Sequence, residues 1–250
     1  MSLTGAADGE PMKVGVGIAD VMCGMYAAVA ILAALRHRDL TGAGQQIDLA
    51  LLDTQVAWLV NEGTNYLVSG KVPGRLGNEH PNIVPYNTFA TADGYVILAV
   101  GNDGQFRKWC GFAGAPELAA DPRFATNSLR VINRRDLYAR MPGYMSAKPT
   151  AAWVEGLAAL GVPCSPVNRL DEVFADPQVQ ARGMRLEMPH DSAASGTVAL
   201  VANPLKLSAT PPSYRHAPPT LGQHTDEVLA ELLDMNDEER GRLRATGTIG

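Results

Sequence analysis

The hydrophobic and polar positions of the chain follow three successive patterns. The first is an apolar run over residues 14–35, in which Asp20 is the only charged residue. The glycine-spaced residues 14–19 predict a short buried strand, and the small apolar residues after Asp20 predict a helix over 21–38. The run therefore predicts a strand that leads through a single carboxylate into a long helix.

A second strand and helix follow the first pair. Residues 45–51 predict a strand, and residues 52–68 predict a helix that ends near Gly70. Such βαβα alternation is typical of an α/β layer. Because two strands are too few for a doubly wound sheet, we expect an incomplete Rossmann-like large domain here.

The second and third patterns occupy the rest of the chain. Two alternating runs predict a β-hairpin over 86–100, and helical spacing dominates 103–160. Repeated prolines over 203–219 indicate an extended connector before two closing helices. The chain is therefore expected to be α/β, in three parts: a piece of the large domain at 1–75, a small α+β domain at 76–202, and a return segment with terminal helices at 203–250.

Charge and composition narrow the classes of function. The chain has 250 residues, of which 46% are hydrophobic and 19% charged, as in ordinary globular proteins. Its net charge of −5 argues against nucleic-acid binding, which leaves a basic footprint. The basic pair at 134–135 predicts a solvated helix face rather than a binding patch.

The cysteines and the apolar run indicate the cellular compartment of the protein. Cys23, Cys110 and Cys164 have no paired spacing, so we expect neither a disulfide framework nor a metal site, and we expect a reducing, cytoplasmic compartment. The apolar stretch 22–35 is too short and too rich in small residues to predict a membrane span. No membrane partner is therefore expected.

Asp20 is the first candidate functional residue. An ionised carboxylate among apolar residues is costly unless something stabilises or uses it. The first turn of the following helix offers free N–H groups and the positive end of the helix dipole. Asp20 is therefore expected to cap this helix, and it is also a candidate nucleophilic carboxylate. The two roles are compatible, because the field that favours a cap also keeps the carboxylate ionised.

A glycine-containing loop is the second candidate region. Gly77 and Asn78 are candidates to donate hydrogen bonds to an oxyanion, since glycine permits close backbone approach to a ligand. Arg75 and His80 are candidates to bind a substrate carboxylate, which arginine holds with two parallel bonds. The alternatives remain open: an ordinary flexible connector, with Arg75 and His80 solvated or paired to Glu79.

Several longer motifs resemble one enzyme family. They are V-G-V-G-I-A-D-V-M-C-G-M-Y, G-R-L-G-N-E-H-P-N-I-V-P-Y, T-A-D-G-Y-V-I-L-A-V-G-N-D-G-Q-F, G-V-P-C-S-P-V-N, F-A-D-P-Q-V and P-P-T-L-G-Q-H-T-D-E-V-L. In this order they resemble the class III CoA-transferases, which include the L-carnitine and bile-acid CoA-transferases. The N-Y-L and L-R-V-I-N-R segments add likeness to the succinate–hydroxymethylglutarate CoA-transferase branch.

The resemblance implies a reaction and an assembly. It implies transfer of coenzyme A between an acyl-CoA thioester and a small, dicarboxylic acid, with Asp20 forming covalent anhydride and CoA-thioester intermediates. It implies a glycine-containing loop that closes over this aspartate, which supports Gly77 and Asn78. Coenzyme A is then a substrate, and no permanently bound cofactor or metal is expected. The family fold also implies an interlinked homodimer whose return segment packs on the large domain.

One departure from the family keeps other functions open. Family members begin with a nucleotide-fold half that supplies most CoA contacts and precedes the stretch matched here, so the CoA-binding residues are expected upstream of this chain. One alternative is a 2-methylacyl-CoA racemase of the same superfamily, which exchanges a proton beside the thioester with a histidine and an aspartate. Another is a truncated fragment that serves as a non-catalytic interaction module.

Overall fold

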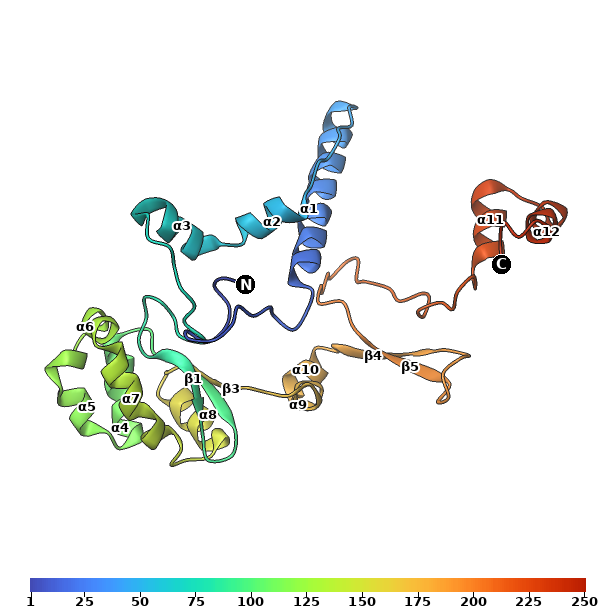
Figure 1. Ribbon diagram of the computed structural model, residues 1–250. Helices are drawn as coiled ribbons and strands as arrows, with labels where there is room; N and C mark the ends of the chain where they lie inside the picture. The colour runs from blue at the N-terminus through green and yellow to red at the C-terminus, as the bar shows by residue number, and fades with distance from the viewer. The chain divides into compact units, whose positions relative to one another are not determined.

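A single long helix dominates the first part of the computed structural model, which describes residues 1–250. Helix α1 (Ile18–Thr41) ends at Gly42, whose φ of +76° is left-handed and whose N–H donates to the Arg38 carbonyl (Figure 1). The helix predicted over 21–38 is confirmed and begins three residues earlier. The chain forms two units, Met1–Val167 and Asn168–Gly250. The predicted division at 75 and 202 stays a prediction.

The two strands predicted in the α/β piece do not form. Residues 14–17 and 43–50 have no strand pairing, and the two sheets of the chain lie elsewhere. A strand exists only where a neighbouring strand pairs with its N–H and C=O groups, and no strand of the first unit pairs with either segment. The βα alternation is therefore present in the sequence pattern but only its helices are formed.

The helix predicted over 52–68 is present as two shorter helices. They are α2 (Leu51–Ala57) and α3 (Val60–Ser69), and α3 ends at Gly70 with a left-handed φ of +68°. The break falls where Val60 has a φ of +42°, which a β-branched residue rarely adopts. The predicted end of the helix is confirmed, and its continuity is not.

A three-stranded antiparallel sheet carries the core of the first unit. Its order is β1 (Tyr86–Ala90), β2 (Tyr95–Ala99) and β3 (Cys164–Pro166), which confirms the hairpin predicted over 86–100 (Figure 1). The helices that follow the hairpin are α4 (Asp103–Ala113), α5 (Pro116–Ala120), the 3-10 turn Pro122–Phe124, α6 (Asn127–Ile132), α7 (Arg134–Met145) and α8 (Thr150–Ala159).

The buried hydrophobic core lies almost wholly between Val84 and Val162, a stretch called the core segment below. It includes fully buried Trp109 and Trp153, and strand residues such as Leu98. Burying aromatic side chains of this size contributes roughly 2–3 kcal/mol each relative to exposure. The core segment therefore holds most of the apolar burial that stabilises this chain.

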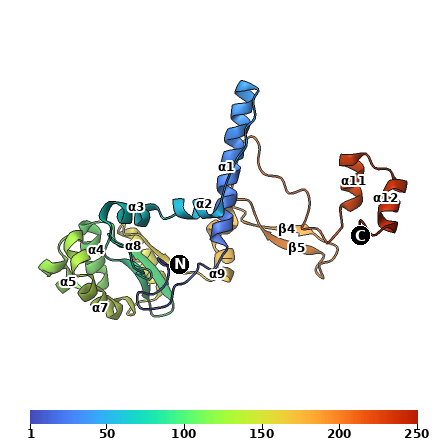
Figure 2. The same cartoon turned by 45° about the horizontal axis from the view of Figure 1, so that its top comes forward.

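The second unit is built from short elements. Helices α9 (Leu170–Ala175) and α10 (Pro177–Ala181) precede a hairpin of β4 (Arg185–Pro189) and β5 (Thr197–Val201), which lie side by side in Figure 2. Helices α11 (Thr225–Leu233) and α12 (Asp237–Ala245) end the unit. Few of its residues are buried, so it is held mainly by backbone pairing and helix caps.

Helix α1 is not covered by the other elements of the first unit. None of its 24 residues is buried, and large apolar residues such as Val29 and Leu32 are about two-thirds exposed. Helix α1 is long and apolar enough to cross a membrane, a test that core helices of soluble proteins and signal sequences also pass. The helix is thus longer than the 22–35 run suggests, and the predicted absence of a membrane partner stays a prediction.

Candidate active site

Asp20 lies in the first turn of α1, at the third residue of the helix. The N-cap is Gly17, and no side chain caps the helix, so the prediction that Asp20 is the cap is wrong by three positions. The Asp20 carboxylate is exposed and reaches back, since a Cβ added at Gly17 would lie 3.1 Å from Oδ2. Glycine at position 17 therefore leaves this carboxylate room at the positive end of the helix dipole.

The Asp20 carboxylate has no partner within the chain and lies beside free N–H groups. The N–H groups of Ala19 and Asp20 have no backbone acceptor, as is usual in a first helical turn. Asp20 itself forms no ion pair and no side-chain hydrogen bond. Its oxygens are thus accessible, and nearby N–H donors are free to stabilise negative charge.

Cys23 lies one turn after Asp20 and is half-buried, whereas the other two cysteines lie in the core segment or at its edge. Burial raises the pKa of the Cys110 thiol to about 12 and that of the Cys164 thiol to about 11. Because a thiol needs to ionise to act as a nucleophile, Cys110 and Cys164 are unsuited to covalent catalysis. The carboxylate of Asp20 remains the better candidate.

The loop residues Arg75 and Gly77 are held by the start of the chain. The Gly77 N–H donates to the Gly5 carbonyl at 2.9 Å, and the Arg75 guanidinium donates to the carbonyls of Ala6 and Gly9. The φ of Gly77 is +63°, so glycine is required there. In this conformation the single N–H of Gly77 already has a backbone acceptor, whereas Arg75 keeps further N–H groups beside the two that bond to Ala6 and Gly9.

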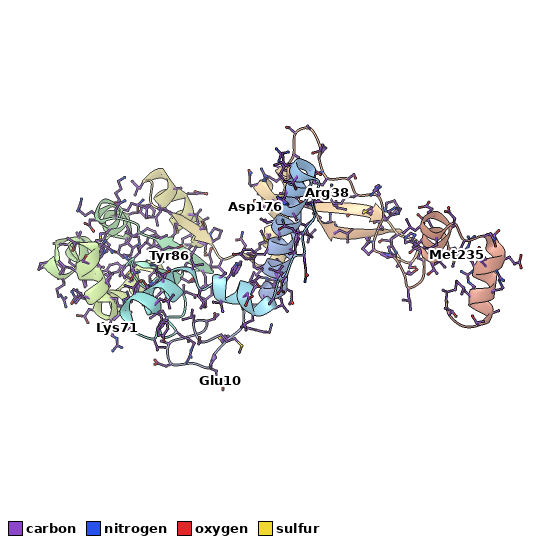
Figure 3. All side chains as sticks on the ribbon, turned by 90° about the horizontal axis from the view of Figure 1, so that it is seen from above. Glu10, Arg38, Lys71, Tyr86, Asp176 and Met235 are labelled. Atoms are coloured by element: carbon purple, nitrogen blue, oxygen red, sulfur yellow. The ribbon has the colours of Figure 1, made fainter.

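Asn78 and His80 remain available. Asn78 is exposed and forms no hydrogen bond. The His80 ring stacks on the Tyr86 ring, with centroids 5.3 Å apart and planes 15° apart. Tyr86 lies at the start of β1 and is labelled in Figure 3. Glu79 pairs with neither Arg75 nor His80, so the expected alternative of such a pair is wrong.

The partner of Glu79 is a residue that the sequence placed on a solvated face. Arg134 lies 3.5 Å from the Glu79 carboxylate, and its side chain is only 18% exposed. It also donates to the carbonyls of His80 and Pro81. Arg135, the next residue, is exposed and has none of these contacts. The expectation of a solvated face is therefore wrong for Arg134, because a basic pair on a helix does not indicate which member faces a loop.

The structure brings some predicted site residues together and leaves others apart. Arg75, Gly77, Asn78 and His80 belong to one loop, but no hydrogen bond or ion pair joins this loop to Asp20. No set of three or more histidine, cysteine, aspartate and glutamate side chains converges as metal ligands would. The chain thus presents an exposed carboxylate on a helix and a separate polar loop.

This mixed fold of helices and small sheets, with an aspartate in the first turn of a small-residue helix, has relatives among CoA-handling enzymes. The family described as CoA-transferase family III matches residues 1–225. The chain therefore belongs to CoA-transferase family III, which confirms the family suggested by its motifs. The predicted fold class is confirmed as well, since a solved structure of a CAIB/BAIF family protein shares it.

Named relatives refine the comparison. The chain is 47% identical over 238 residues to the succinate–glutarate CoA-transferase of Agrobacterium fabrum, covering 93% of this chain and 58% of that protein. It is 37% identical to the human succinyl-CoA:glutarate CoA-transferase, covering 100% and 56%. A CAIB/BAIF family protein from Brucella suis superposes with a TM-score of 0.78 at 44% identity, covering 93% and 60%. The chain thus spans somewhat more than half the length of these relatives.

Proposed function

We propose that this chain takes part in moving coenzyme A between an acyl-CoA thioester and a small dicarboxylic acid. Family membership and the names of the relatives, which act on succinate, glutarate and mesaconate, support the proposal. The observation that carries it is the exposed carboxylate of Asp20 in the first turn of α1, where free N–H groups and the helix dipole favour an ionised nucleophile. Acyl-CoA is a substrate in this proposal, with no permanently bound cofactor.

The proposed reaction passes through two covalent intermediates. A carboxylate oxygen of Asp20 attacks the thioester carbon, the C–S bond breaks, and CoA leaves as a thiolate from a mixed anhydride. The thiolate attacks the aspartyl carbon, the first acid leaves as a carboxylate, and CoA is held on Asp20 as a thioester. The acceptor carboxylate then attacks this thioester, and the same steps in reverse release the new acyl-CoA. Dividing one transfer into such steps is the usual logic of covalent catalysis.

The loop is proposed to bind the acid and the oxyanion. Asn78, exposed and without a partner, is the readiest donor, and removing one oxyanion donor typically slows a reaction by about 10²–10³-fold. Gly77 would first exchange the Gly5 carbonyl for a substrate oxygen, and Arg75 would donate from the guanidinium N–H groups that do not bond to Ala6 and Gly9. His80 is proposed to bind the distal carboxylate of the acid.

The assembly is also a proposal. The uncovered apolar side chains of α1 support an interlinked homodimer, in which a small-residue helix packs closely against another layer. Three free cysteines support a reducing, cytoplasmic location. Parts at 1–75, 76–202 and 203–250 are proposed as the large-domain piece with Asp20, the small domain and the return segment.

Trapping with hydroxylamine tests the covalent step. We expect incubation with succinyl-CoA to form an acyl or CoA adduct on Asp20. Hydroxylamine should trap this adduct as a stable hydroxamate, because the anhydride and the thioester are both activated carbonyls. Peptide mapping by mass spectrometry locates it. A hydroxamate on another carboxylate would contradict the role of Asp20. If neither an adduct nor CoA transfer is detected, the result would favour the non-catalytic interaction module.

Isotope exchange separates transfer from racemisation. A transferase needs an acceptor acid and moves CoA to it, whereas a racemase needs no acceptor and exchanges the proton beside the thioester with solvent. We expect no deuterium incorporation from heavy water into a 2-methylacyl-CoA, and CoA transfer when glutarate is added. Exchange without an acceptor, and without movement of CoA, would establish the racemase alternative instead.

A further inference from the structure

Four polar side chains of α6 and α7 contact a single segment of the chain. Asn127, Arg130, Arg134 and Tyr138 follow one another at spacings of three, four and four residues, as on one helical face. Every one of these four side chains hydrogen-bonds to residues 79–86, the segment that contains His80 and leads into β1. These four side chains therefore tie the segment to α6 and α7.

Asn127 and Arg130 hold the end of the 79–86 segment that enters the core segment. Asn127 accepts from the Val84 N–H at 3.0 Å and donates to the Asn82 carbonyl at 2.9 Å. Arg130, fully buried, donates to the Val84 carbonyl at 2.6 Å. Both polar groups of Val84 are therefore satisfied by side chains, and this end of the loop is anchored to the core.

The other two members act on His80 through its backbone and through its stacking partner Tyr86. Arg134 donates to the His80 and Pro81 carbonyls and lies against Glu79. The Tyr138 hydroxyl accepts from the Tyr86 N–H at 3.1 Å, and the His80 N–H donates to the Tyr86 carbonyl at 3.0 Å. Burial raises the pKa of Tyr138 to about 12, so its hydroxyl stays protonated. Arg134 thus fixes the His80 backbone, and Tyr138 fixes the residue on which the His80 ring stacks.

The bonding of the imidazole decides which nitrogen carries the proton. His80 Nδ1 accepts from the Asn82 N–H at 3.1 Å, so the proton of the neutral ring lies on Nε2. Nε2 has no partner in the protein and is not buried. A neutral His80 therefore presents one N–H donor in a fixed direction, without needing to be charged.

We propose that Arg134 and Tyr138 are positioning residues that hold His80 as a neutral Nε2–H donor to the distal carboxylate of the dicarboxylic acid. The inference rests on the proposed function of the loop, and it adds the residues that set its selectivity. Arg134 suits the task because its planar fork bonds several carbonyls at once, which lysine does not. Selectivity for diacids over monoacids then depends on a residue that never touches substrate.

Arg134→Gln tests the inference with a readout that a structural role alone would not move. We expect the ratio of kcat/KM for glutarate over that for pentanoate, the monoacid of the same length, to fall on the order of 10-fold. Rates with pentanoate should change little. Arg135→Gln removes the same charge one residue away, where no contact with the loop exists, and should leave the ratio unchanged.

A second measurement does not depend on activity. At about pH 8.5, where an ordinary histidine is neutral, the nitrogen chemical shifts of His80 report the Nε2–H tautomer. We expect Arg134→Gln and Tyr138→Phe to mix the two tautomers, and Arg135→Gln to leave them as in the parent chain. Arg134→Lys keeps the charge but not the planar guanidinium, so we expect its tautomer ratio to lie between those of the parent chain and Arg134→Gln. It replaces Arg134→Gln if that variant has a much lower melting temperature.

The outcomes separate this inference from the proposed function. If His80→Gln abolishes diacid selectivity but Arg134→Gln changes neither selectivity nor tautomer, the positioning role is wrong and the function of the loop stands. If Arg134→Gln mixes the tautomers but the chain transfers no CoA, the positioning role stands and the proposed function fails. An unaltered tautomer in Arg134→Gln and Tyr138→Phe would overturn the inference directly.

Discussion

Asp20→Asn is expected to lower the rate of CoA transfer by roughly 10⁴-fold or more, the scale on which enzymes lose activity when their nucleophile is removed. Asparagine keeps the size of the side chain but has no anionic oxygen to attack the thioester. Neither covalent intermediate can then form. The measurement is the initial rate of succinyl-CoA-dependent glutaryl-CoA formation, followed by chromatography.

The same substitution should barely change the stability of the fold. The Asp20 side chain is exposed and forms no ion pair or hydrogen bond, so its loss leaves no buried group unsatisfied. Only its favourable interaction with the helix dipole is lost. Melting temperatures of the parent and the variant should therefore agree closely.

Asp53→Asn is the matched control for this experiment. Asp53 is the third residue of α2, as Asp20 is of α1, and it is also exposed. The control loses the same charge from the same helical position, so it should reproduce the small change in melting temperature and keep full transfer activity. Equal activity losses in both variants would show that charge in the first turn, and not a nucleophile at Asp20, supports the reaction.

The sequence predicts best those elements whose causes are local. Asn236 with Glu239 predicts a capping box, and both of its hydrogen bonds are present in α12. The hairpin over 86–100 and the helix end at Gly70 are likewise set by neighbouring residues. In contrast, the strands expected at 14–19 and 45–51 depend on partner strands, which no local pattern supplies.

The candidate site shows the same division. The position of Asp20 at the start of a helix follows from the apolar run after it, although the cap itself is Gly17. The partners of Arg75 and Arg134 lie 53 to 69 residues away in the chain, so no local pattern predicts them. The available signal was the polar spacing along 127–138, which a solvated helix face also produces.

Arg130→Met is expected to lower the free energy of unfolding of the core segment by about 2–6 kcal/mol, because it leaves two buried carbonyl groups without their hydrogen-bond donor. The Arg130 side chain is fully buried, with 0% of its area exposed to solvent. Its guanidinium lies 4.5 Å from the centre of the Phe106 ring. Burial lowers its pKa from the usual arginine value, while the Asp103 carboxylate at 2.9 Å opposes this. Methionine would fill much of the volume but donate nothing.

The loss arises mainly from the acceptors left behind. The Val84 and Phe124 carbonyls accept from Arg130 at 2.6 Å and 3.0 Å, and unsatisfied buried carbonyls cost roughly 1–3 kcal/mol each. Asp103 is 39% exposed, so water can replace its partner at smaller cost. The measurement is urea unfolding followed by tryptophan fluorescence, which reports on Trp109 and Trp153 in the core.

Arg107→Met provides the comparison, because Arg107 is exposed and forms no ion pair, and its loss should change stability by less than about 0.5 kcal/mol. Equal unfolding midpoints for Arg130→Met and Arg107→Met would show that the buried guanidinium does not hold the fold. Arg130 lies in α6 and Arg134 begins α7, yet we expect the first to govern folding and the second the selectivity of the loop. That contrast follows from what each leaves unpaired: Arg130 serves carbonyls inside the core, whereas Arg134, 18% exposed, serves the part of the loop that water can reach.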